Sequence, residues 1–208
     1  MQRIAERLVL LWCLLIAGTA AAHAEESQLA APAMDSAMQA AMAKMQELGS
    51  PSEGHKALES FVGSWTYTGQ FWMSPDGPPQ TMTGTTMNTL IFGGRFLKQE
   101  FTGGAMMEGQ PPFEGLGIVG YDNMRKEYQT VWFDNMATGM MQGTAQFDAA
   151  AKTLTEQGDF SCPMTGETHR KMRTTWKVLD ANHTTYESYM STPDGKEFKA
   201  MEIRYTRS

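Results

Sequence analysis

Residues 113–148 read FEGLGIVGYDNMRKEYQTVWFDNMATGMMQGTAQFD, and this stretch decides the fold. Apolar and polar residues alternate in three segments, at residues 113–121, 127–134 and 140–147. Asp122-Asn123 separates the first two segments and Ala137-Thr138-Gly139 the last two, and both are typical of tight turns. Period-two alternation between close turns predicts three consecutive antiparallel strands, a β-meander.

The same signals continue on both sides, from residue 64 to residue 207. Turn residues recur about every 8–11 residues, which predicts roughly ten strands in succession. The pair Gly93-Gly94 predicts a two-residue hairpin turn, because glycine accepts positive φ. No helices alternate with the strands, which disfavours a parallel α/β sheet. An open sheet would leave two exposed edges, whereas a closed barrel leaves none.

We therefore predict a mainly β fold. It is a single up-and-down antiparallel β-barrel of about ten strands, wide enough to hold a ligand and preceded by one or two short N-terminal helices.

The first 24 residues have the features of a secretory signal peptide. Arg3 and Arg7 precede an apolar run at residues 8–19 that is short for a bilayer span, and Ala22-His23-Ala24 is a small-x-small cleavage site. We expect cleavage after Ala24, no stable membrane anchor afterwards, and a periplasmic or secreted protein. The predicted organisation is a signal peptide at 1–24, a tail with a methionine-rich helix at 25–52 and the barrel domain at 53–208.

Charge and cysteine content limit the function classes. The 208 residues carry a formal net charge of −6 and no basic cluster, so a nucleic-acid partner is not expected. Without the signal peptide Cys162 is the only cysteine, and no internal disulfide can form. We interpret Cys162 as a small buried core residue, because no histidine or basic helix start near it in sequence would make it reactive.

Two helices are predicted before the barrel. Met34, Met38, Met42 and Met45 are spaced for one face of a helix at residues 34–48. Thioethers bind copper(I), but methionine also packs against irregular apolar surfaces. We favour an amphipathic helix that contacts the domain, a second copy of the chain or a partner. A second helix is predicted at residues 53–61, with Ser52 as its cap and His55 as an exposed or capping residue.

The last predicted strand, residues 198–207, indicates which side chains face inward. One face is apolar until Arg207 at its end, and carries Met201, Ile203 and Tyr205. First and last strands are neighbours in a closed barrel, so we expect Arg207 to stack on Trp65 and close that end. A Gly63-Ser64-Trp65 start with a late arginine resembles the calycin barrels, the lipocalins and fatty-acid-binding proteins.

Polar side chains follow one face of two other strands. The strand at 127–134 carries Tyr128, Thr130, Trp132 and Asp134, and the strand at 183–191 carries His183, Thr185, Glu187 and Tyr189. The second set either faces solvent or lines the cavity. Metalloprotease, Cys-x-x-Cys, serine-hydrolase and phosphate-loop motifs are absent from the sequence, so we predict no catalytic or metal-binding residues. The candidate ligand-binding residues are Trp132, Asp134, His183, Glu187, Tyr189 and Tyr205.

Short segments between residues 38 and 208 resemble the bacterial family known as domain of unknown function 1579. They are Pro51 to Leu58, Gly63-Ser64-Trp65, Phe71 to Pro75, Gly93 to Leu97, Pro112 to Gly115, Gly120 to Asn123, Asp134 to Gly139 and Glu202 to Arg207. The resemblance implies a calycin-like barrel without assigned catalytic residues. It draws attention to residues in matching segments: His55, Trp132, Asp134, Glu187 and Arg207. A looser likeness to haem-binding nitrobindin-type barrels rests on the Gly-x-Trp start, with no axial histidine identified.

Four functional hypotheses follow. The leading one is a non-catalytic barrel that binds a small apolar molecule. The second is haem or metal binding through His183 or His55. The third is a hydrolase-type enzyme that uses Asp134, His183 and Glu187, which requires these groups within about 4 Å of one another. The fourth is a partner-binding protein that uses the methionine face.

Overall fold

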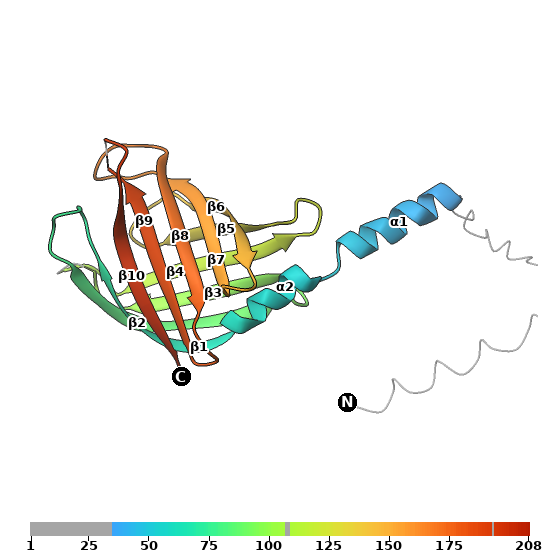
Figure 1. Cartoon of the computed structure of the whole chain (residues 1–208), viewed down its shortest axis with the longest axis horizontal. Coiled ribbons are helices and arrows are strands. Elements are labelled where there is room, and N and C mark those ends of the chain that lie inside the picture. The colour runs from blue at the N-terminus through green and yellow to red at the C-terminus, as the bar shows by residue number, and fades with distance from the viewer. Residues whose placement is uncertain (1–34, 107–108, 193) are drawn as a thin grey trace, which may run out of the picture. The chain divides into compact units, whose positions relative to one another are not determined.

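The computed structural model describes residues 35–106, 109–192 and 194–208. In them the chain forms a closed barrel of ten antiparallel strands, as the sequence predicted (Figure 1). The strands are β1 (Gly63–Phe71), β2 (Gln80–Ile91), β3 (Phe96–Gly103), β4 (Phe113–Asp122), β5 (Glu127–Asp134), β6 (Met141–Asp148), β7 (Thr153–Phe160), β8 (Arg170–Val178), β9 (His183–Ser191) and β10 (Glu197–Arg207). The predicted signal peptide lies outside the described residues.

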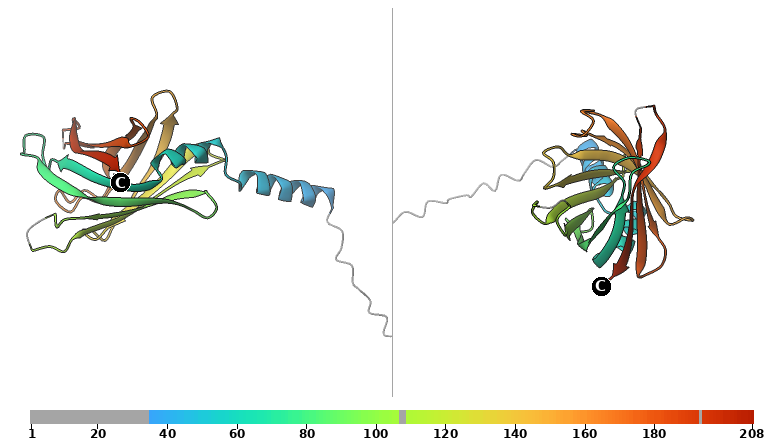
Figure 2. Two further views of the ribbon diagram at one scale, coloured as in Figure 1. Left: turned by 90° about the horizontal axis from the view of Figure 1, so that it is seen from below. Right: turned by 90° about the vertical axis from the view of Figure 1, so that its left-hand side faces the viewer.

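Every strand pairs with its neighbours along the chain, and β1 pairs with β10 to close the ring (Figure 2). Trp65 lies opposite Arg207 in this last pairing. The three strands of the meander, β4 to β6, begin and end within one residue of their predicted bounds. The alternation of side chains therefore determined both their number and their extent.

The segment before the barrel contains α1 (Ser36–Leu48), α2 (Glu53–Ala57) and a 3₁₀ turn, η1 (Leu58–Phe61). The helix predicted at residues 53–61 is thus an α-helical turn that tightens into a 3₁₀ turn. The chain divides into two compact units with the boundary after Gln39, and the barrel lies in the unit that starts at Ala40. In the described part of the chain, every helix is too short or too polar to cross a membrane.

One end of the barrel is filled by the segment that precedes β1. Leu58 and Phe61, on η1, are 1% and 0% exposed and pack against inward-facing residues of the strands. The ring centroids of Phe61 and Trp176 are 3.8 Å apart. The Tyr128 hydroxyl donates a hydrogen bond of 2.7 Å to the Gly54 carbonyl. We call this end the floor of the barrel.

The turn between β2 and β3 differs from the prediction. Ile91 pairs with Phe96, so four residues rather than two connect the strands. Gly93 and Gly94 have φ values of 67° and 85°, and Phe92 adopts a φ of 50°. Both glycines accept positive φ as expected, but the added left-handed residue at Phe92 lengthens the turn.

His55 and Asn123 tie the helical segment to the floor. His55 is 6% exposed, which contradicts the exposed alternative, and its Nδ1 accepts a 2.9 Å hydrogen bond from the Ser52 backbone N–H in a capping box. The Ser52 hydroxyl donates to the Asn123 side-chain oxygen at 2.6 Å. The Asn123 amide donates to the Leu48 and Ser50 carbonyls. Asn123 is therefore a tertiary anchor as well as a turn residue.

The buried His55 predicts a pH dependence of stability. Burial, and then the charge of Arg95, lower the pKa of His55 below its usual 6.5. The unfolded chain then binds the proton more readily, so stability is complete above the unfolded pKa and falls as the pH drops towards the folded pKa. Urea unfolding at about pH 7.5 and about pH 5.5 should show this loss in the wild type, and a smaller loss in His55→Gln, which keeps the capping box. An equal loss in both proteins would assign the effect to other groups.

Candidate functional site

The interior of the barrel is packed at the floor and accessible beyond it. The inward-facing residues next to the floor are buried: Leu97, Val119, Tyr128, Ala145, Leu154 and Trp176. Farther along the strands, some inward-facing residues are buried, such as Phe101, Met172 and Ser188. Others are only half-buried: Thr130, Trp132, Glu156, Tyr186, Met190 and Met201. A close-packed interior would bury them, so space at least the size of a water molecule reaches these side chains, and we call this half of the interior the lumen.

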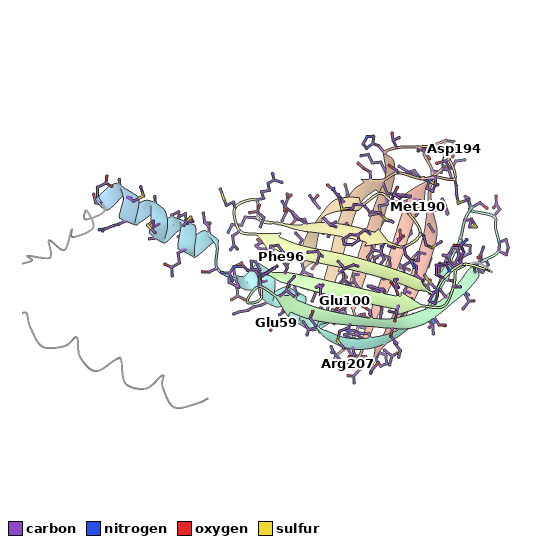
Figure 3. All side chains as sticks on the ribbon, turned by 180° about the vertical axis from the view of Figure 1, so that it is seen from behind. Glu59, Phe96, Glu100, Met190, Asp194 and Arg207 are labelled. Carbon is purple, nitrogen blue, oxygen red and sulfur yellow. The ribbon has the colours of Figure 1, made fainter. Side chains whose placement is uncertain are left out.

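Figure 3 locates the two ends, with Phe96 near α2 and with Met190 and Asp194 at the opposite end.

Aromatic side chains form one wall of the lumen. Phe101 lies at the centre of this wall, with its ring centroid 5.1 Å from that of Trp132 and 6.3 Å from that of Tyr205. Tyr67 contacts both Phe101 and Tyr205, and Phe113 stacks against Trp132 at 6.4 Å. Tyr67, Phe101 and Tyr205 are themselves buried, so the accessible part of this wall belongs mainly to the half-buried rings of Phe113 and Trp132.

A polar cluster lies beside this wall, on β5, β7, β8 and β9. Glu156 of β7 points inward, since its neighbours across the sheet, Ala145 and Thr174, are both buried. Its carboxylate accepts hydrogen bonds from the hydroxyls of Thr130 on β5 and of Thr174 on β8, the latter at 2.8 Å. The side chain crosses β6 over Gly143, where an added Cβ would come within 2.7 Å of Oε1. Only glycine leaves room for the carboxylate there.

Tyr186 extends this cluster onto β9. Burial, and then the charge of Glu156, raise the pKa of the Tyr186 hydroxyl, and hydrogen bonds with Thr174 and Ser188 oppose this only in part. Tyr186 is nevertheless not fully buried. A side chain enclosed by protein that keeps some accessible surface is expected beside an internal space. We call Thr130, Glu156, Thr174 and Tyr186 the polar cluster.

Gln99 of β3 adds a polar group near the aromatic wall. It is 9% exposed, and in the described part of the chain its amide has no hydrogen-bond partner. Its Oε1 would lie 3.0 Å from a Cβ added at Gly117, beside the ring of Trp132. A buried amide without a partner is available to a ligand.

The predicted site residues separate into two groups. Trp132, Asp134 and Tyr205 face inward. The indole N–H of Trp132 donates a 2.9 Å hydrogen bond to Asp134 Oδ2, so these two act as a pair near the open end. Tyr205 and Trp132 each lie against the ring of Phe101.

The other predicted residues lie on the outer face of the sheet. Glu187 accepts hydrogen bonds from Lys199 at 3.1 Å and from the Tyr189 hydroxyl at 2.9 Å. His183 pairs with Asp180 at 2.9 Å in the turn before β9. The structure therefore does not bring Asp134, His183 and Glu187 together. Of the two interpretations of the polar residues of β9, the solvent-facing one agrees with the structure.

No histidine of the described residues faces the lumen. His55 caps α2, while His169 and His183 are exposed and paired with Asp159 and Asp180. The described part of the chain also contains no group of three or more histidine, cysteine or acidic residues placed to hold a metal ion. A haem or metal ligand set is not provided by the histidines that the sequence suggested.

Arg207 and Trp65 meet at the seam between β10 and β1. The guanidinium carbon of Arg207 lies 4.0 Å from the centroid of the Trp65 ring, which is the contact expected from the sequence. Arg207 also donates to the carbonyls of Val62 and Ala181. The Trp65 indole N–H donates to the Phe61 carbonyl at 3.0 Å, and thereby links the seam to the floor.

Glu156 and Gln99 were missed by the sequence analysis. The segment at 153–160 reads TLTEQGDF, and its inward face carries Leu154, Glu156, Gly158 and Phe160. A carboxylate between two apolar residues on one face was the signal that could have identified Glu156.

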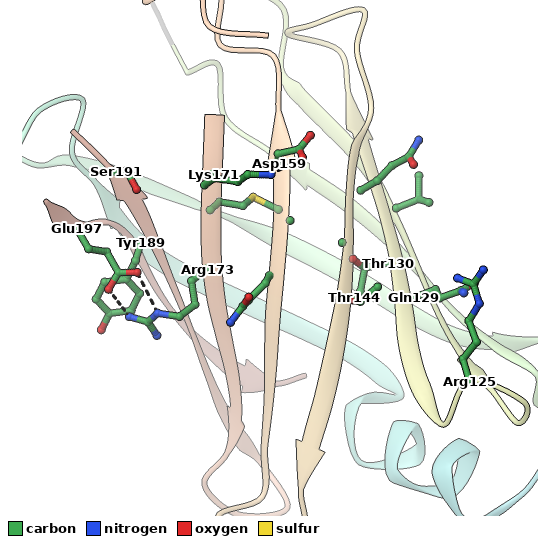
Figure 4. Close-up of a pocket in the computed structure, with 16 residues that line it drawn as sticks. Arg125, Gln129, Thr130, Thr144, Asp159, Lys171, Arg173, Tyr189, Ser191 and Glu197 are labelled. Carbon is green, nitrogen blue, oxygen red and sulfur yellow. Dashed lines mark hydrogen bonds and ion pairs between the residues drawn. The ribbon is translucent and has the colours of Figure 1, made fainter. Parts of the chain in front are cut away.

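The exposed faces offer other features. Met38, Met42 and Met45 of α1 are 53%, 45% and 67% exposed, and Met34 lies outside the described residues. A groove of about 790 Å³ crosses the outer face of β5 to β9 (Figure 4). Its charges are largely paired within it, as Arg173 with Glu197 at 2.7 Å and Lys171 with Asp159 at 3.0 Å.

Cys162 is buried as predicted, but its surroundings are more polar than the sequence indicated. Arg170 Nη1 lies 3.4 Å from its sulfur. Burial alone would raise the pKa of the Cys162 thiol, but hydrogen bonds from Thr165, Arg170 and backbone N–H groups outweigh it and lower the pKa. The basic neighbour is Arg170, eight residues away in sequence, which the sequence analysis had not considered.

Comparisons with known proteins place the chain in a family. No curated protein matches it. The crystal structure of Rv2717c from M. tuberculosis is similar at 15% identity and a TM-score of 0.53, over 76% of this chain and 99% of that one. The S-type phycobiliprotein lyase CPES from Guillardia theta is similar at 10% identity and a TM-score of 0.52, over 78% and 96%. At these identities the likeness shows the fold alone. The profile of the family described as "Protein of unknown function (DUF1579)" matches residues 50–207, so the chain belongs to the DUF1579 family, the one that its short segments resemble.

Proposed function

We propose that this protein is a non-catalytic binding protein that takes a small, largely apolar molecule into the lumen of its barrel. The observation that carries the proposal is the contrast along the barrel axis. Inward-facing residues beside the floor are buried, whereas several beyond it, among them Thr130, Glu156 and Met190, are only half-buried. Ligand sites are typically concave, mostly apolar and equipped with a few polar groups, and the lumen combines an aromatic wall with the polar cluster and Gln99.

The arrangement of polar groups supports binding rather than hydrolysis. Asp134, His183 and Glu187 each have a different partner, and two of them lie on the outer face. General acid–base catalysis needs its groups within hydrogen-bond reach of the same proton. We further propose that the protein acts outside the cytoplasm, on the strength of the signal-peptide features in its first 24 residues.

Narrowing the lumen should weaken binding. N-phenyl-1-naphthylamine, a neutral aromatic probe whose fluorescence rises in apolar surroundings, is expected to bind saturably to the wild type. Met190 faces inward near the open end (Figure 3). Met190→Trp should raise the dissociation constant by about tenfold or more, because the larger ring occupies ligand space.

Met87→Trp is the matched control, because Met87 is 45% exposed on the outer face of β2. It should leave the dissociation constant unchanged. The proposal fails if the probe does not saturate, or if the two variants bind it equally well.

A further inference from the structure

The polar cluster holds an inward-facing carboxylate that has no basic side chain beside it among the described residues. Glu156 is half-buried and inward-facing, and its hydrogen bonds come from the two neutral hydroxyls of Thr130 and Thr174. In the described part of the chain, no lysine, arginine or histidine nitrogen lies within 4.0 Å of it. Charges held inside proteins are normally paired, because the loss of hydration is costly. An unpaired carboxylate on an accessible wall is therefore free to take a cationic partner.

The carboxylate has capacity for such a partner. An ionised carboxylate offers about four lone-pair positions. Two are occupied by the threonine hydroxyls, one at each oxygen. Gly143 leaves the wall beside the carboxylate without a side chain, so the oxygens are not covered from that strand.

The other charges that face inward do not neutralise Glu156. Arg170 donates from Nη1 to Cys162 and from Nη2 to the Ser191 carbonyl, and its Nε lies 3.7 Å from Glu167. Asp134 is a second acid and is held by Trp132. The middle of the lumen is therefore negative, with aromatic rings beside the polar cluster, since Tyr186 packs against them.

From this juxtaposition we infer the ligand class: a largely apolar molecule that carries an organic ammonium group, with the ammonium bound by Glu156 and the apolar part against the aromatic wall. This inference rests on the proposed lumen binding. An ammonium can donate hydrogen bonds to the free lone pairs of the carboxylate, and such charge-assisted bonds are stronger than neutral ones. Aromatic faces add a favourable interaction with the same cation.

The test compares three probes of one shape and different charge by isothermal titration calorimetry: 2-naphthylmethylammonium, 2-naphthylmethanol and 2-naphthoate. The wild type should bind the ammonium at least about tenfold more tightly than the alcohol, and the carboxylate most weakly. Glu156→Gln keeps the shape of the side chain and removes its charge. It should abolish the preference for the ammonium and leave the affinity for the alcohol within about twofold of the wild type.

Glu100→Gln is the matched control, because Glu100 is an exposed carboxylate on the outer face of β3, paired with Lys98 (Figure 3). It should retain the full preference. Binding of all three probes with equal affinity, or an ammonium preference that survives Glu156→Gln, overturns the inference while leaving lumen binding intact. Failure of every probe to bind overturns the proposed function as well. The melting temperature of Glu156→Gln should equal that of the wild type. Equal values show that a lost preference for the ammonium reflects the lost charge and not unfolding.

Discussion

Replacement of Phe61 by alanine is expected to lower the free energy of unfolding by about 3–5 kcal/mol. Phe61 is 0% exposed and is enclosed by the floor cluster, with the tilted ring of Trp176 at a centroid distance of 3.8 Å. Truncation to alanine removes a large apolar surface and leaves a cavity that the surrounding strands cannot collapse to fill, because they belong to a closed ring. Urea unfolding followed by tryptophan fluorescence measures the loss.

Phe133→Ala provides the comparison. Phe133 lies on the outer face of β5 and is 40% exposed, so its truncation should cost roughly 1 kcal/mol or less. A Phe61→Ala protein as stable as Phe133→Ala would mean that η1 does not seal the barrel as described.

Gly63→Ala is expected to cost about 2–4 kcal/mol, from two separate causes. Gly63 has a φ of 123°, a conformation that alanine adopts only with strain. An added Cβ would also lie 2.4 Å from Arg207 Nη1 and would push that guanidinium off the Trp65 ring and the Val62 carbonyl. The expected readout is the urea midpoint relative to the wild type.

A double-mutant cycle separates the two causes. In an Arg207→Ala background only the backbone strain remains, so Gly63→Ala should cost less there than in the wild type by about 1 kcal/mol or more. Gly104→Ala is the control for glycine replacement, because no other heavy atom lies within 4 Å of its added Cβ and its φ is not positive. Strict additivity of the two changes would show that Gly63 does not act through Arg207.

Most of the fold could be predicted from local sequence patterns. Alternation and turn residues are properties of consecutive residues, so strand number and bounds could be read from the sequence, as with β9 at His183–Ser191. The inward face of β10 was predicted correctly at Ile203 and Tyr205, which are 6% and 5% exposed. By the same alternation Ala200 would face outward, but it is 4% exposed. A β-bulge between Lys199 and Met201 shifts the alternation there.

The candidate site depends on contacts that no local pattern contains. Glu156 reaches Thr130, 26 residues away in sequence, across a strand whose glycine makes the passage possible. Asn123 bonds to Ser50 from 73 residues away. Such partners follow from strand register and curvature, which a single sequence does not specify. The polar stripe of β9 was ambiguous for the same reason, since inward and outward faces can be told apart only when one of them is clearly apolar.

Closure between β1 and β10 affects how the chain can be made. Trp65 and Arg207 are partners in the same ladder, yet β1 is the first strand of the ring to be translated and β10 the last. During synthesis one edge of β1 therefore stays unpaired, and Trp65 stays uncovered, until residue 207 has been added. Late pairing of distant segments slows folding and leaves an edge open to other chains. Factors that shield nascent chains would act on this protein during that interval.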